Sequence, residues 1–130
     1  LYATSKEIIR SYNPLLKPLD LTYTQYLVML VLWENQQVTM KELGSLLCLD
    51  SGTLTPVIKK MADKGLLQRR RADKDERITI LSLTSNGKAL EEKAKDIPAK
   101  ILASLPLEPD ELVLLQKLSK KMLTNFREKH

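Results

Sequence analysis

The sequence predicts a mainly α-helical fold with one small β-hairpin. Apolar residues recur at helical spacing along most of the 130-residue chain, whereas residues 66–83 contain two β-prone stretches separated by charged residues. Just before this hairpin, two short predicted helices are joined by the three residues 48–50. Two helices joined in this way and followed by a hairpin form a winged helix-turn-helix, flanked here by further helices on both sides.

The N-terminal region predicts two helices. Apolar side chains in residues 1–19 follow a helical spacing, and two prolines near the end of this stretch are expected to bend or stop the helix. Thr22 can cap a second helix that runs to residue 33 or 34, with Gln25 completing a capping box. Residues 35–37 are expected to form a turn.

The first helix of the predicted helix-turn-helix covers residues 40–47, because Thr39 and Glu42 have the spacing of a capping box. Its expected inward face comprises Leu43, Leu46 and Leu47.

The second helix of this pair is expected to start after Asp50, which can cap it, and to end near Lys64. Gly65 then supplies the left-handed residue that commonly follows a helix. Pro56 removes one backbone hydrogen bond, so we expect a loosened first turn. The apolar stripe that predicts the buried face comprises Leu54, Val57, Ile58 and Met61.

The hairpin is predicted from residues 66–71 and 77–83, with a charged tip over residues 72–76. A fifth helix follows, capped by Thr84 or Ser85 and kinked at Pro98. The last helix should run from about residue 111 to 129.

We therefore expect one domain over residues 1–130. Residues 21–84 form its winged helix-turn-helix core, and residues 1–20 and 85–130 are dimerisation helices. The apolar stripes of the terminal helices are too extensive for a monomer to cover, which favours pairing with a second copy.

The residue composition argues against several classes of protein. Cys48 is the single cysteine and His130 the single histidine, so an internal disulfide, a multi-cysteine metal site and a histidine-based catalytic relay are not expected. We therefore predict a protein that is not an enzyme and has no cofactor. No apolar run approaches the ~20 residues that span a bilayer and no signal peptide is recognisable, so a cytoplasmic location is expected. Cys48 is interpreted as a small, partly buried residue, with a second redox-active thiol as the alternative.

Positive charge is concentrated near the helix-turn-helix. The net charge is +5, and residues 59–77 alone carry eight basic and four acidic side chains. A solvated charged loop would be the simpler interpretation of such a stretch. Its place directly after a predicted helix-turn-helix instead favours contact with nucleic acid.

Short polar side chains at the start of the second helix suit entry into the major groove of duplex DNA, because bulky ones would hold the backbone away. We predict that Ser51, Thr53 and Thr55 contact base edges or phosphates, and that Lys59 and Lys60 contact phosphates. The alternative is that these are ordinary exposed helix residues.

In the hairpin, Arg77 is predicted to reach into the adjacent minor groove. Asp75 can hold its guanidinium in a charge-assisted fork. The alternative interpretation is a surface ion pair of little energetic consequence.

The string LDSGTLTP at residues 49–56, followed by Asp75-Glu76-Arg77 and Leu83-Thr84, resembles the MarR family of regulators. The resemblance is strongest to the organic-hydroperoxide-resistance branch, and residues 21–26 share it. It implies a homodimeric transcriptional regulator, with repression the expected mode, on a pseudo-palindromic operator in double-stranded DNA. Family DNA contacts would fall on Asp50, Ser51, Thr53 and Arg77, with Asp75 as the wing aspartate.

The resemblance also implies a thiol switch. An organic hydroperoxide oxidises a cysteine to a sulfenic acid, which proceeds to a mixed disulfide with a low-molecular-weight thiol or to higher oxides, and the dimer releases DNA. The tyrosines that surround this cysteine match Tyr2, Tyr12 and Tyr23. The cysteine itself would lie one helical turn before Tyr2, so we expect native residues ahead of Leu1.

Three other functions remain open. A regulator of the same fold could release DNA on binding a small phenolic or aromatic ligand, and an upstream cysteine would argue against it. A thiol peroxidase is poorly supported, because no cysteine–histidine pair is available. A protein-interaction module with an acidic partner would lack a preference for palindromic duplex. The operator, the regulated genes and the inducer are not determined by these residues.

Overall fold

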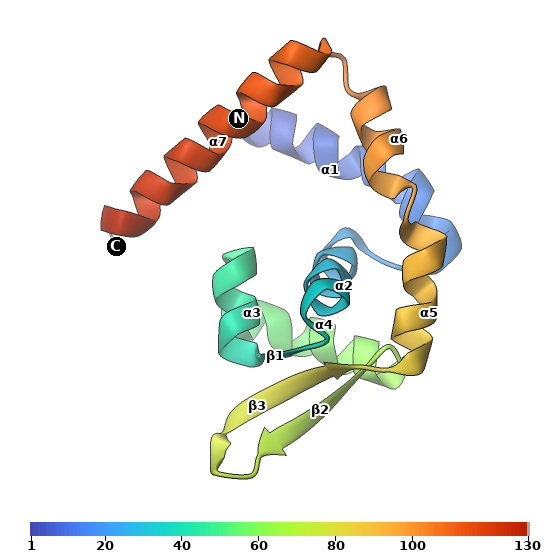
Figure 1. Ribbon diagram of the computed structural model, residues 1–130, viewed down its shortest axis with the longest axis vertical. Helices are drawn as coiled ribbons and strands as arrows, with labels where there is room; N and C mark the ends of the chain where they lie inside the picture. The colour runs from blue at the N-terminus through green and yellow to red at the C-terminus, as the bar shows by residue number, and fades with distance from the viewer. Residues whose placement is uncertain (130) are drawn as a thin grey trace.

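The computed structural model describes residues 1–129, so His130 lies outside the described residues. Eight helical segments and three strands follow one another along the described part of the chain (Figure 1). The helical segments are α1 (Tyr2–Leu16), the short 3-10 helix η1 (Lys17–Leu19), α2 (Tyr23–Asn35), α3 (Met40–Leu47), α4 (Ser51–Asp63), α5 (Ser85–Ala94), α6 (Ile97–Ser104) and α7 (Pro109–Lys129). The strands are β1 (Gln37–Thr39), β2 (Leu67–Ala72) and β3 (Asp75–Leu83).

The centre of the molecule is a winged helix-turn-helix, as predicted. Helices α2, α3 and α4 pack together above an antiparallel sheet with strand order β1-β3-β2, and the β2–β3 hairpin extends away from them (Figure 1). Helix α5 runs beside the core from the end of the sheet, and α1, α6 and α7 lie on the side of the core away from the hairpin (Figure 1). The largest fully buried side chains are Leu16, Met29, Leu32, Leu43, Leu54, Ile58, Met61, Leu67 and Leu81.

Side-chain caps begin the helices where the sequence predicted them. Thr22 and Gln25 form the expected capping box of α2, with N···O distances of 3.2 and 3.1 Å. Thr39 and Glu42 form that of α3. At α5 the cap is Thr84, whose hydroxyl accepts the Gly87 amide at 3.0 Å. These local bonds satisfy backbone donors that a helix leaves free at its N-terminus.

The predicted turn over residues 35–37 was wrong, because Gln37 already begins the strand β1. This strand pairs antiparallel with β3 and places Val38 opposite Leu81. Three residues are too few to show an alternating pattern, so only pairing with β3 reveals the strand. The inward position predicted for Leu46 was also wrong, since its side chain is 56% exposed.

The first helix ends between its two prolines, as predicted, whereas Pro98 acts differently from the prediction. Helix α1 passes through Pro14 and ends at Leu16, where η1, which contains Pro18, follows. Pro98 does not kink a single fifth helix but lies in the first turn of a separate one, since α5 ends at Ala94 and α6 begins at Ile97. A proline is tolerated in a first turn because the amide it lacks would have no partner in the helix.

The last helix carries a large apolar surface that the rest of the single chain leaves uncovered. The exposed apolar side chains of α7 are Val113, Leu114, Leu115, Leu118, Met122, Leu123 and Phe126. Contiguous apolar surface of this kind marks a contact surface more often than a free one. Among residues 1–129, no helix combines the length and the apolar character needed to cross a bilayer.

Gly87 is required by close packing between α5 and the start of the hairpin. A Cβ atom there would lie 2.2 Å from the Leu66 carbonyl oxygen, and the Gly87 carbonyl accepts the Trp33 indole N–H at 2.9 Å. We expect Gly87→Ala to lower the free energy of unfolding by about 1–3 kcal/mol, because the added methyl must displace backbone. Urea denaturation would measure this loss.

Gly52→Ala is the matched control, since a Cβ there meets only Asp50 Oδ1 at 3.5 Å. Equal stability of the two variants would contradict the packing role assigned to Gly87.

Candidate nucleic-acid interface

The exposed start of α4 is held by a side-chain cap. Asp50 Oδ1 accepts the Thr53 amide at 2.7 Å, and this hydrogen bond lowers the pKa of the Asp50 carboxyl below its ordinary value. Thr55 Oγ1 donates to the Ser51 carbonyl at 2.7 Å. The side chains of Ser51, Thr53 and Thr55 are all exposed. Helix α4 therefore presents a surface of short polar groups at its N-terminus, and it runs without a break through Pro56.

The connection between α3 and α4 is tight because Gly44 leaves room for the backbone. A Cβ on Gly44 would lie 2.8 Å from the Leu49 carbonyl oxygen. Cys48 ends α3 in the left-handed conformation, with φ 58°. Its side chain is exposed rather than partly buried as predicted, and Arg127 of α7 donates to Cys48 Sγ and to the Ser45 carbonyl.

The wing is irregular where it carries Arg77. Strands β2 and β3 leave only Asp73 and Lys74 as the tip, so the five-residue tip predicted over 72–76 was too long. In the ladder, Ala72 faces Asp75 while the preceding residue, Arg71, faces Thr79. The three residues between Asp75 and Thr79 therefore bulge out of β3, with Arg77 in the middle of them. Bulges re-aim side chains in this way next to functional sites.

Asp75 and Arg77 form the predicted fork. Arg77 Nε lies 3.1 Å from Asp75 Oδ1 and Nη2 lies 3.2 Å from Oδ2, while the Arg77 amide donates to the same carboxylate at 3.0 Å. These bonds lower the pKa of the Asp75 carboxyl, with the guanidinium as the larger cause. The Arg77 side chain is 91% exposed. Arg71 supports the bulge by donating to the Glu76 carbonyl at 2.8 Å. Arg77 is thus held in orientation yet remains available to a partner.

A groove of about 900 Å³ lies between the helix-turn-helix and the wing. Residues from α3, from the start of α4 and from both strands of the hairpin line it. Four of them are basic, namely Lys41, Arg69, Arg71 and Arg77, and none of its described lining residues is acidic. The arrangement offers a continuous site for a polyanion such as a phosphate backbone.

The structure brings together only part of the predicted site. Ser51, Thr55 and Arg77 line the groove, whereas Thr53 on α4 and Asp50, which caps that helix, do not. Lys59 and Lys60 lie farther along the exposed side of α4 and do not line it.

Lys41, Arg69 and Arg71 were missed as groove residues. The arginines belong to the basic run over residues 59–77, but their place in a groove depends on strand register. Lys41 carries no signal in the sequence beyond its charge.

The three tyrosines assigned to a redox pocket do not form one cluster within a single chain. The rings of Tyr12 and Tyr23 meet edge to face at 4.9 Å, and Tyr26 lies 5.8 Å from Tyr12. Burial raises the pKa of the phenols of Tyr12, Tyr23 and Tyr26. Tyr2 is 78% exposed, ten residues before Tyr12 on the same helix, which separates them by about 15 Å. Tyr26 was missed, although its i+3 spacing from Tyr23 is a signal that could have found it.

Comparison with known proteins agrees with this architecture. Residues 10–97 match the family described as "Transcriptional regulator SarA/Rot". The organic hydroperoxide resistance transcriptional regulator of Bacillus subtilis (strain 168) is 44% identical over the whole chain, which covers 88% of that protein. The regulator SarZ of Staphylococcus saprophyticus is 41% identical over 99% of the chain and 86% of its own length.

Two groups of solved structures are similar to the chain. The structure of reduced AbfR bound to DNA, a protein known from Staphylococcus epidermidis, has a TM-score of 0.83 and 32% identity, covering 98% of this chain and 87% of that one. A cysteine-to-serine mutant of MarR from E. coli complexed with operator DNA has a TM-score of 0.81 and 28% identity, covering 94% of this chain and 89% of that one. The chain therefore belongs to the MarR family of winged helix-turn-helix transcriptional regulators, in the group that includes the SarA/Rot and organic hydroperoxide resistance regulators.

Proposed function

We propose that the chain binds a pseudo-palindromic operator in double-stranded DNA as a homodimer, and that oxidation of a cysteine by an organic hydroperoxide lowers this affinity. The observation that carries the DNA-binding part is the basic groove between the start of α4 and the oriented Arg77 of the wing. The likeness to reduced AbfR and to MarR, each in complex with DNA, supports it.

Binding would place α4 in the major groove and the wing in the adjacent minor groove. The short side chains of Ser51, Thr53 and Thr55 allow the helix backbone to approach base edges, and the positive end of the helix favours phosphate oxygens. Arg77, pre-oriented by Asp75, loses little side-chain entropy on entering a narrow minor groove, whose negative potential attracts it. Lys59 and Lys60 would neutralise phosphates farther along.

The dimer is supported by the apolar surface of α7. Residues 1–20 and 85–130 would supply the interface, and a second copy would cover the side chains from Val113 to Phe126 that the single chain leaves exposed. A two-fold dimer presents two copies of α4 related by symmetry, which matches the two halves of a palindromic site.

The redox part is supported by the tyrosine pair and by the relatives. Tyr12 and Tyr23 are partly buried phenols in contact, suited to donate hydrogen bonds to a cysteine of the partner subunit, and Tyr2 would join them only from the other chain. The Bacillus subtilis relative bears the name of an organic hydroperoxide resistance regulator, and AbfR has been solved in reduced, overoxidised and disulfide forms. The sensing cysteine is expected about one helical turn ahead of Tyr2 in the native protein.

Replacing the wing arginine tests the groove. We expect Arg77→Ala to weaken operator binding about tenfold, because it removes the oriented minor-groove contact. Arg77→Lys should restore little, since an ammonium cannot form the bidentate fork with Asp75. Fluorescence anisotropy with a labelled operator would measure the Kd. Arg70→Ala is the control, as it removes the same charge from the same hairpin but from outside the groove; an equal loss in both variants would show that only net charge matters.

The two lysines of α4 should act through phosphates. We expect the double variant Lys59→Gln/Lys60→Gln to reduce the slope of log K against log salt by about 2, because each phosphate contact contributes about 1. Binding measured between low and moderate salt gives the slope. Lys88→Gln on α5 should leave it unchanged, and an unaltered slope in the double variant would remove both lysines from the interface.

The thiol switch is tested on the native protein by gel shift with its own promoter DNA. Treatment with an organic hydroperoxide should release the DNA, and a thiol reductant should restore binding. Serine at the sensing cysteine should abolish the response. Tight binding that ignores peroxide would retain the DNA-binding proposal, refute the thiol switch and favour release by a small phenolic ligand.

A further inference from the structure

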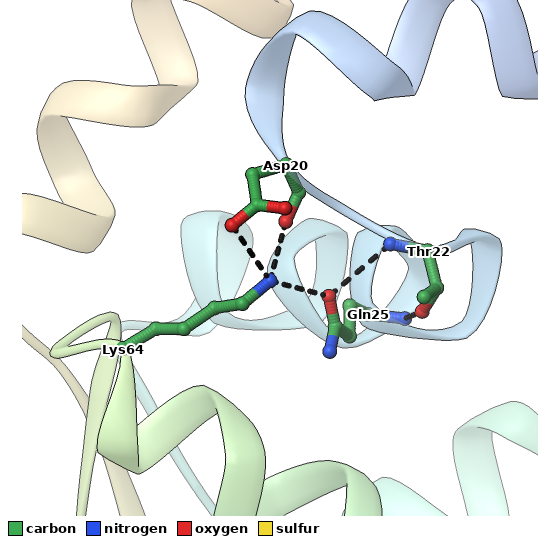
Figure 2. A network of polar contacts seen from close by, with 4 residues as sticks. All are labelled: Asp20, Thr22, Gln25 and Lys64. Carbon is green, nitrogen blue, oxygen red and sulfur yellow. Dashed lines mark hydrogen bonds and ion pairs between the residues drawn. The ribbon is translucent and has the colours of Figure 1, made fainter.

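Lys64, which follows the last residue of α4, makes a dense set of polar contacts with the corner between α1 and α2. Its ammonium donates to the Asp20 carbonyl and to Gln25 Oε1 at 3.2 Å, and it lies 3.4 Å from Asp20 Oδ2 (Figure 2). Three acceptors around one ammonium match its three N–H donors. The side chain of Lys64 is 32% exposed and that of Asp20 is 91% exposed, so the bond to Gln25 is the contact that is partly shielded from water.

Both residues that receive Lys64 are themselves constrained. Gln25 is 4% exposed, and its Oε1 also accepts the Thr22 amide in the capping box that begins α2 (Figure 2). Asp20 ends η1 with φ 55°, in the left-handed region, and its amide donates to the Lys17 carbonyl. Lys64 therefore contacts two residues that are themselves held by hydrogen bonds, Gln25 through its side chain and Asp20 through its backbone amide.

Other contacts at the end of α4 are made with the core and with the start of α5: Met61 is fully buried, and the Gly65 carbonyl accepts the Thr84 hydroxyl at 2.6 Å. The helix stops at Asp63, and Gly65 reverses the chain with φ 78° before β2 begins. A glycine suits this position because it adopts the left-handed conformation without strain. The contacts of Lys64 with Asp20 and Gln25 join the end of α4 to the α1–α2 corner, just before the chain turns at Gly65.

The same corner contains part of the proposed redox pocket. Tyr23 follows Thr22 directly, and Tyr23 and Lys64 line one small cavity of about 360 Å³ together with Asn13 and Lys17. A movement of the α1–α2 corner at Tyr23 would therefore reach Asp20 and Gln25, and through them Lys64.

We infer that Lys64 is a positioning residue that holds the C-terminal end of α4, the proposed recognition helix, against the α1–α2 corner, and that operator affinity depends on this contact. The inference rests on the proposed function, in which α4 enters the major groove. It assigns Lys64 a role in orienting the helix, whereas Lys59 and Lys60 on the same helix are proposed to bind phosphate.

The test compares Lys64→Met with Lys17→Met in the full-length protein. Both variants lose one positive charge beside the same cavity, but within residues 1–129 the Lys17 ammonium makes no hydrogen bond or ion pair. We expect Lys64→Met to weaken operator binding about three- to tenfold with an unchanged salt slope, because partly exposed charged hydrogen bonds are lost but no phosphate contact is. Lys64→Arg, which keeps charge and donors, should recover at least half of the loss on a logarithmic scale.

A measurement without DNA tests the positioning directly. The amides of Lys64, Gly65 and Leu66 close the end of α4 by donating to Lys60, Ala62 and Met61. Their hydrogen exchange should be at least about three times faster in Lys64→Met than in Lys17→Met, because the end of the helix opens more often.

Equal Kd values and equal exchange rates for the two methionine variants would overturn the inference. A salt slope that falls by about 1 in Lys64→Met would also overturn it, because Lys64 would then be a phosphate contact. If the unsubstituted protein fails to bind its operator, the proposed function fails. The exchange rates would then still decide whether Lys64 holds the helix.

Discussion

Burial of one face of α4 is the interaction on which the rest of the structure depends. Leu54, Ile58 and Met61 are completely buried against α2, α3 and the sheet. Burying one side chain of this kind stabilises the folded state by about 1.5–3 kcal/mol. Because the three lie on one stripe, their burial sets the rotation of the helix about its axis. That rotation places Ser51, Thr53 and Thr55 on the exposed surface, so the hydrophobic core decides which side chains of α4 are open to solvent.

The ends of α4 are fixed by polar groups of two kinds. At the N-terminus Asp50 caps the helix by accepting the amide of Thr53, so this bond involves no other helix or strand. At the C-terminus Lys64 reaches residues that are 39 and 44 positions away in the chain. The first contact stabilises the helix itself, whereas the second relates it to the corner that carries Tyr23.

The wing shows how an irregular ladder orients a side chain, that of Arg77. A regular ladder would put the side chains of residues 76, 77 and 78 on alternating faces of β3. The bulge instead frees Arg77, and Asp75 and Arg71 hold the bulge in shape through a carboxylate fork and a carbonyl hydrogen bond. The groove between wing and helix then gains its basic lining from residues far apart in the chain, Lys41 on α3 and Arg69 on β2.

The sequence by itself determined the features that depend on neighbouring residues. The caps at Thr22, Thr39 and Asp50, the buried stripe of α4 and the left-handed Gly65 follow from spacings of a few positions, and the structure confirms them. Only the tertiary structure decided the strand β1, the bulge around Arg77 and the contacts of Lys64. Each of these depends on segments brought together across the fold, by strand register or by helix packing. The spacing of residues along the chain does not predict such partners, because these contacts form, and stabilise the protein, only once the core has folded.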